Sequence, residues 1–153
     1  MEKDFHLHNS FAFWLSRLTS VMQENFNRRL EEFQVSWPQW MLLNALDNDM
    51  GHTPAQIAVC LGIDRSAITR LVDRLENKSL VIREHDKLDR RSVNIFMTPQ
   101  GKRVIGQLNA LAYEHQQHFL SQLHSSECRA LKGELQKMLR AGGLDSATQW
   151  RLL

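Results

Sequence analysis

The first part of the chain carries apolar residues at steps of three and four, with polar residues between them. This spacing is typical of an amphipathic helix, which we place from near Phe5 to Glu32. A helix this long and this apolar needs partner helices to cover its stripe, so the pattern already suggests dimerisation. The stripe consists of Leu7, Phe11, Trp14, Leu15, Leu18, Met22, Phe26 and Leu30.

Two short helices are expected next, because each apolar run follows a start signal. Residues 36–39 (SWPQ) combine a capping serine with an early proline, and they begin a helix that runs to about Leu46. Residues 53–56 (TPAQ) repeat this signal for a helix that ends at Leu61, before Gly62.

A third short helix, residues 65–77, leaves one polar face uncovered. Asp64 can cap it, and its apolar stripe consists of Ile68, Leu71, Val72 and Leu75. At about 100° per residue, the opposite face carries Ser66, Thr69, Arg70, Asp73, Arg74 and Asn77. Together with the preceding helix, this element predicts a helix-turn-helix whose second helix can enter a DNA major groove.

After Ser79 the apolar residues recur at every second position, as they do in a β-strand. Residues 80–85 and 92–97 predict two strands of a hairpin, and Thr98 then caps a second long helix. The intervening residues 86–92 are too many for a tight turn and too charged to be buried, so this loop should project into solvent. A last helix is expected from about Ser126 to Arg140, ended by Gly142 and Gly143.

This order of elements predicts a mainly α (α+β) fold in a single domain, residues 1–153. A winged helix-turn-helix, residues 36–98 with a hairpin at 80–97, is flanked by long N- and C-terminal dimerisation helices at 5–34 and 100–153.

The composition is that of a globular protein, with 42% apolar and 24% charged residues. We expect a cytoplasmic protein without a membrane partner, because no apolar stretch is long enough for a span and the start lacks a signal-peptide layout. The net charge is only +2, but residues 61–103 hold ten Lys and Arg against six Asp and Glu. This basic middle segment favours a polyanionic partner such as nucleic acid, although a solvated surface is an alternative.

Several side chains are candidates for DNA contact. On the third short helix they are Arg65, Ser66, Thr69, Arg70 and Arg74, with Arg70 the first choice for a base contact. Alternatively, these arginines are solvated helix charges with local partners. In the loop, Arg90 and Arg91 can enter a minor groove, and Asp89 is expected to hold one of them in a fixed rotamer. A solvated charged turn is the alternative.

Three segments in this order resemble the MarR family of winged helix-turn-helix transcriptional regulators. They are residues 37–43 (WPQWMLL), residues 53–76 (TPAQIAVCLGIDRSAITRLVDRLE) and residues 89–101, from Asp-Arg-Arg to Thr-Pro-Gln-Gly. The resemblance implies a homodimer that places two recognition helices in successive major grooves of a pseudo-palindromic operator, usually to repress transcription. The chain departs from the family at Ser79, where members commonly have glycine.

Family members often bind small aromatic acids between the first helix and the winged module. By this resemblance the candidate effector-binding residues are Trp14, Arg17, Trp37, Trp40 and Asn44, with rings for stacking and Arg17 for a carboxylate. The alternatives are a tryptophan core and a salt bridge at the dimer interface.

Other chemistry receives less support. The pair His115 and His118 could begin a metal site, and Cys60 or Cys128 could sense oxidants, so a metal- or redox-responsive regulator is the alternative. We expect neither a metal nor a cofactor. The chain lacks a Gly-rich phosphate loop, a nucleophile elbow and a convergent carboxylate pair, so we expect no enzyme activity.

Overall fold

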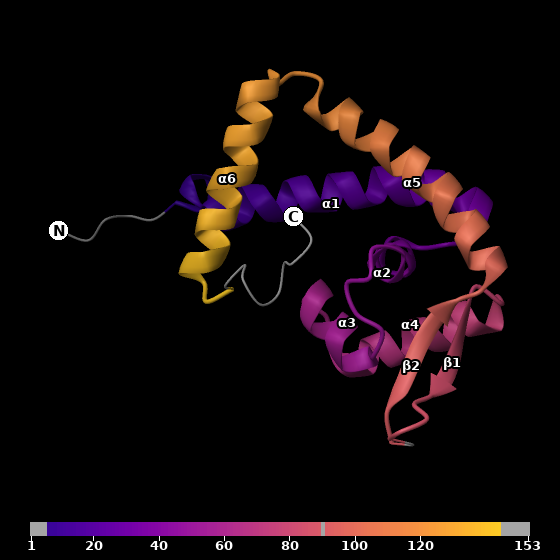
Figure 1. Ribbon diagram of the computed structural model, residues 1–153. Helices are drawn as coiled ribbons and strands as arrows, with labels where there is room; N and C mark the ends of the chain where they lie inside the picture. The colour runs from indigo at the N-terminus through magenta and orange to yellow at the C-terminus, as the bar shows by residue number, and fades with distance from the viewer. Residues whose placement is uncertain (1–5, 90, 145–153) are drawn as a thin grey trace. The chain divides into compact units, whose positions relative to one another are not determined.

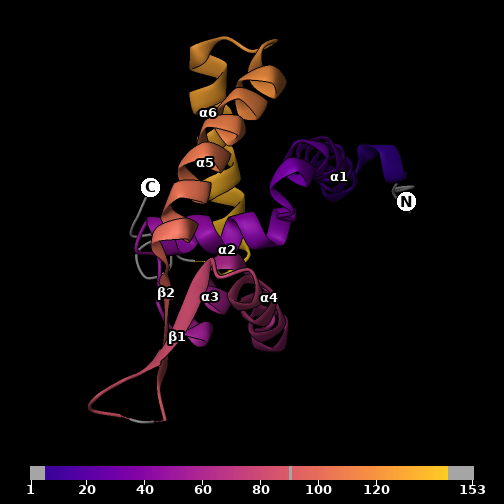
Figure 2. The ribbon, with the colours of Figure 1, turned by 90° about the vertical axis from the view of Figure 1, so that its right-hand side faces the viewer.

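The computed structural model describes residues 6–89 and 91–144, drawn in Figures 1 and 2. The chain divides into two compact units, residues 1–37 and residues 38–153, and each is described by itself. Within the described residues, no helix is both long and apolar enough to cross a membrane.

The first unit is built on the helix α1 (Phe11–Leu30), with the short 3-10 helices η1 (Leu7–Asn9) before it and η2 (Glu31–Phe33) after it. The hydroxyl of Ser10 caps α1 by accepting the backbone N–H of Phe13 at 3.3 Å. The predicted long helix is therefore confirmed, although regular α-helix covers a shorter range than near Phe5 to Glu32.

The second unit contains the helix-turn-helix: α2 (Trp37–Asp47) leads into it from the unit boundary, and α3 (Pro54–Leu61) and α4 (Arg65–Asn77) form it. Thr53 and Gln56 make the predicted capping box of α3, because each side chain accepts the other's backbone N–H, at 3.2 and 3.1 Å. Gly62 ends α3 with a φ of 63°, in the left-handed region that glycine adopts readily.

The α4 helix presents its apolar stripe to the core, as predicted. Its buried residues are Ile68, Leu71, Val72 and Leu75. The prediction that the side chain of Asp64 caps α4 is wrong, because that side chain makes no capping hydrogen bond. Asp64 contributes to the first turn of α4 through its backbone instead, because its carbonyl accepts the N–H of Ile68 at 3.0 Å.

Ser79 follows α4 in a left-handed conformation, with a φ of 58°. This conformation costs a residue with a Cβ free energy that glycine avoids. The carbonyl of Ser79 accepts the hydroxyl of Thr98 at 2.6 Å, so the turn is tied to the start of the next helix.

The predicted hairpin consists of β1 (Val81–His85) and β2 (Val93–Met97), paired antiparallel with Val81 opposite Met97 and His85 opposite Val93. Val81 and Ile95 are fully buried, and the N–H of Ile95 donates to the carbonyl of His52 at 2.7 Å. In Figure 2 the hairpin extends beyond α3 and α4.

Two further helices, α5 (Pro99–Leu120) and α6 (Ser125–Ala141), complete the second unit. The hydroxyl of Thr98 caps α5 by accepting the N–H of Gly101 at 3.0 Å. At Gly101 the helix lies against the backbone of Leu80, and a Cβ there would come within 2.1 Å of the Leu80 carbonyl oxygen. Glycine is therefore required where α5 packs on the turn before β1.

We predict that Gly101→Ala destabilises the fold by at least about 2 kcal/mol, because backbone atoms would have to shift to relieve the clash. Gly106→Ala is the matched control, since a Cβ at Gly106 meets no atom within 4 Å. It should stabilise α5 by up to about 1 kcal/mol through helix propensity. Urea unfolding measures both, and equal stabilities for the two variants would contradict the close packing of Gly101.

Candidate nucleic-acid interface

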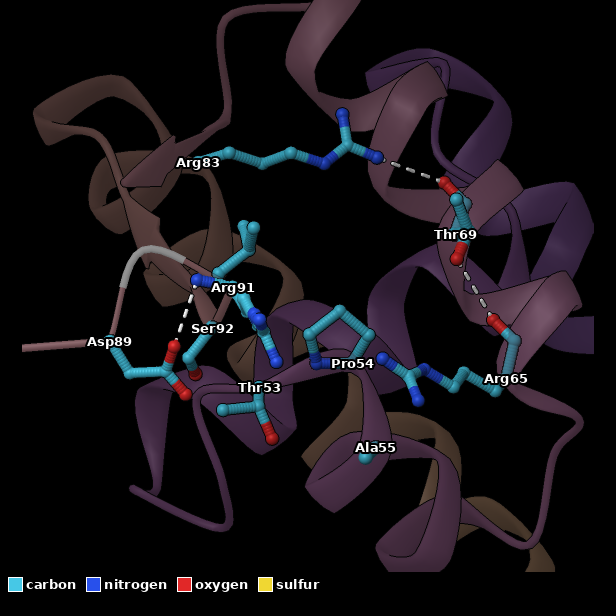
Figure 3. Close-up of a pocket in the computed structure, with 10 residues that line it drawn as sticks. Thr53, Pro54, Ala55, Arg65, Thr69, Arg83, Asp89, Arg91 and Ser92 are labelled. Carbon is cyan, nitrogen blue, oxygen red and sulfur yellow. Dashed lines mark hydrogen bonds between the residues drawn. The ribbon is translucent and has the colours of Figure 1, made fainter. Parts of the chain in front are cut away.

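The helix α4, the start of α3 and the loop between β1 and β2, here called the wing loop, surround a hollow of about 430 Å³, shown in Figure 3. In this view the side chains of Arg65 and Arg91 approach Pro54 from opposite sides. The hollow is lined by three arginines and one acidic residue, so its charge suits an anion. The lining residues are Thr53, Pro54, Ala55, Arg65, Thr69, Arg83, Asp89, Arg91, Ser92 and Val93.

The structure thus brings four of the predicted DNA-facing residues around one space: Arg65 and Thr69 from α4, and Asp89 and Arg91 from the wing loop. The other three predicted residues of α4 do not line this hollow but are exposed on the same helix. They are Ser66, Arg70 and Arg74. Arg90 lies outside the described residues.

Asp86 organises the wing loop. Its carboxylate accepts the backbone N–H groups of Leu88 at 2.7 Å and Asp89 at 3.2 Å. These two hydrogen bonds are the largest influences on the carboxyl group, and they lower the pKa of Asp86 below its ordinary value of 3.8. The backbone N–H of Asp86 also donates to the carbonyl of Ser92 at 2.9 Å, which closes the base of the loop.

The carboxylate of Asp89 shapes the backbone next to the wing arginine. It accepts the backbone N–H of Arg91 at 3.0 Å, and the carbonyl of Asp89 accepts the N–H of Ser92 at 2.9 Å. These hydrogen bonds fix the backbone conformation at Arg91, and so the direction in which its side chain starts. The expectation that Asp89 fixes an arginine rotamer through the side chain stays a prediction.

Arg83 on β1 is a residue that sequence reasoning did not single out. Its guanidinium donates to the carboxylates of Asp73 and Glu76, both at 2.5 Å, and to the carbonyl of Thr69 at 3.2 Å. Partial burial acts to lower the pKa of Arg83, but the hydrogen bonds and charges of these two carboxylates outweigh it, so the net shift is upward. The wing strand is thereby joined to the exposed side of α4.

The candidate effector residues fall in both units. Trp14, Arg17 and Trp37 belong to the first unit, whereas Trp40 and Asn44 belong to the second. Their joint pocket therefore stays a prediction.

Some of these side chains have local partners of their own. The indole N–H of Trp14 donates to the carbonyl of His8 at 2.8 Å. The amide N–H of Asn44 donates to the side chain of Asn109 at 2.8 Å, which links α2 to α5. Asn44 therefore has a structural role within the second unit.

The two histidines of α5 singled out from the sequence pack against an aromatic ring. His115 is buried and its ring lies 4.9 Å from that of Phe119, while His118 packs edge-on against the same ring. In residues 6–89 and 91–144, no group of three His, Cys, Asp or Glu is placed to hold a metal ion. Burial raises the pKa of the Cys60 thiol, which disfavours its reactive thiolate.

The winged module matches known proteins in both sequence and fold. Residues 33–92 match the family model described as the MarR family. MepR of Staphylococcus aureus, solved as a complex with DNA, superimposes with a TM-score of 0.79 at 27% identity, covering 86% of this chain and 98% of MepR. The segment of residues 33–92 is therefore similar to the MarR family.

Two further comparisons agree with this similarity. The repressor CouR, solved with a 23-mer DNA duplex, superimposes with a TM-score of 0.79 at 26% identity, over 90% of this chain and 98% of CouR. A Thauera aromatica protein, named as a transcriptional regulatory protein for the hcr operon, is 30% identical over 99 residues, or 65% of this chain. The match spans 60% of that relative's length.

We predict that the wing loop loses its order in acid at a pH below 3.8, the ordinary aspartate pKa. Because the pKa of Asp86 is lowered in the folded state, its stabilising effect is complete above the ordinary value and is lost as the pH falls through the lowered one. The amide NMR resonance of Leu88 should report this titration. Asp86→Asn retains an acceptor oxygen and should abolish it, whereas a wild-type midpoint at or above 3.8 would contradict the role of Asp86.

Proposed function

We propose that this chain is a sequence-specific, DNA-binding regulator of transcription without catalytic activity. In this proposal α4 enters a major groove while the wing loop reaches the adjacent minor groove. The observation that carries the proposal is the placement of Arg65 and Arg91 around one hollow, on two elements that can contact the same stretch of DNA. The DNA complexes of MepR and CouR support it.

The division of labour among the DNA-facing residues follows from their positions. Ser66, Arg70 and Arg74 are exposed on α4 and would read base edges or contact phosphates. Arg91 leaves a projecting loop, where a guanidinium gains from the negative potential of a narrow minor groove. Arg90 is assigned the same role from sequence alone.

We also propose that the chain acts as a homodimer on a pseudo-palindromic operator. Large apolar side chains are exposed on α1, α5 and α6, and a second copy would cover them. They include Phe11 at 76% exposure, Trp14 at 58%, Tyr113 at 66% and Met138 at 46%. A dimer pairs two recognition helices, so the palindrome would mirror the symmetry of the protein.

The proposal predicts that Arg91→Ala weakens operator binding by roughly 1 to 3 kcal/mol per half-site, the scale of one well-placed contact. Fluorescence anisotropy with an operator selected from genomic DNA measures this loss. Arg129→Ala on α6 is the matched control, since it removes the same exposed charge outside the hollow and should bind as the wild type does. Sedimentation should show the same dimer for both variants.

Two results would defeat this proposal. An Arg91→Ala protein that binds its operator as tightly as the wild type would remove the wing from the interface. A wild-type protein that fails to bind any duplex at micromolar concentration and low salt would defeat the DNA-binding function itself.

Repression with release by a small aromatic acid is the more specific form of the proposal. A complex of CouR from Rhodococcus jostii RHA1 with p-coumaroyl-CoA has been solved, which supports ligand response within this fold. Benzoate, a simple aromatic carboxylate, should weaken operator binding, and Arg17→Ala should reduce that effect without changing affinity in its absence. Equal responses of both proteins would remove Arg17 from the effector site.

A further inference from the structure

Arg83 on β1 makes several hydrogen bonds to α4, and these join the wing to that helix. Its guanidinium bonds to Asp73, to Glu76 and to the carbonyl of Thr69, and Figure 3 shows the side chain extending from β1 toward Thr69. The backbone N–H of Arg83 also donates to the Glu76 carboxylate, at 3.2 Å. Both the main chain and the side chain of one strand residue are thus tied to α4.

The spacing of the acceptors explains why an arginine suits this place. Thr69, Asp73 and Glu76 are separated by four and three residues, so they form one row along the helix. A planar guanidinium presents five N–H donors in a fixed fork and can bind all three acceptors together. A lysine ammonium concentrates its three donors on one atom and cannot reproduce that arrangement.

The electrostatic consequence concerns the surface proposed to face DNA. The side chains of Asp73 and Glu76 are 55% and 38% exposed, and they stand beside the arginines of α4. Uncompensated carboxylates at this place would repel phosphates. Arg83 neutralises part of this charge while its own side chain is only 28% exposed.

We propose that Arg83 is a positioning residue, which sets the angle of the wing on α4 and so places Arg91 relative to Arg65. The proposal rests on the proposed DNA-binding function. Because three of the five guanidinium donors of Arg83 are bonded to α4, we expect it to act through Asp73 and Glu76 rather than through a phosphate contact of its own.

The test compares Arg83→Gln and Arg83→Lys with the wild type in duplex binding over a range of salt concentrations. We expect Arg83→Gln to weaken binding by about fivefold, the upper end for a partly exposed ion pair. Arg83→Lys should recover little of this loss, because it keeps the charge but not the fork. The slope of log K against log salt should stay unchanged in both variants.

Hydrogen–deuterium exchange on the free protein supplies a readout that does not depend on DNA. Amides of residues 81–97 should exchange faster in Arg83→Gln, whereas Glu84→Gln, one position along the same strand and outside the Arg83 network, should exchange as the wild type does. Circular dichroism checks that each variant folds. If Arg83→Gln does not fold, Asp73→Asn, which removes one acceptor of the same network, provides the second comparison.

Three results would overturn the proposal. Full binding by Arg83→Lys would show that charge alone suffices, and a slope reduced by about 0.9 in Arg83→Gln would show a direct phosphate contact. Unchanged exchange in the hairpin would show that Arg83 does not hold the wing. A wild-type protein that binds no duplex would instead defeat the proposed function, while the exchange comparison would still decide whether Arg83 ties the wing to α4.

Discussion

The tie between the Arg83 guanidinium and the exposed side of α4 is the interaction on which the proposed DNA-binding surface depends. An isolated two-stranded hairpin is marginally stable in water, so the wing needs contacts with neighbouring elements to be stable. The buried side chains of Val81 and Ile95 hold its base in the core. Arg83 then fixes its direction, and the position of Arg91 follows.

The second constraint lies where the hairpin ends. Thr98 bonds to both the turn at Ser79 and the first turn of α5, and Gly101 lets the helix approach the Leu80 backbone. The base of the wing and the start of α5 are therefore held together at the backbone of Ser79 and Leu80. In the proposed dimer joined through α5 and α6, a displacement of α5 would shift the base of the wing.

Much of the fold could be predicted from the sequence because local rules determine it. Helical periodicity placed the helices, and the caps at Thr53 and Thr98 formed as their sequences indicate. The roles of Arg83 and Asp86 could not be predicted in the same way. A strand arginine has no local signal for its partners, which lie on a helix seven to fourteen residues earlier. Asp64 shows the converse, since a favourable capping residue makes no side-chain cap.

In the proposed complex, α4 and the wing contact adjacent grooves of one duplex. Chemical footprinting of the operator tests it most directly, because dimethyl sulfate probes guanine N7 in the major groove and hydroxyl radicals probe sugars along the minor groove. We expect wild-type protein to protect both. Arg91→Ala should lose the flanking minor-groove protection and keep that of the major groove. Protection of the major groove alone by the wild type would contradict a wing that binds DNA.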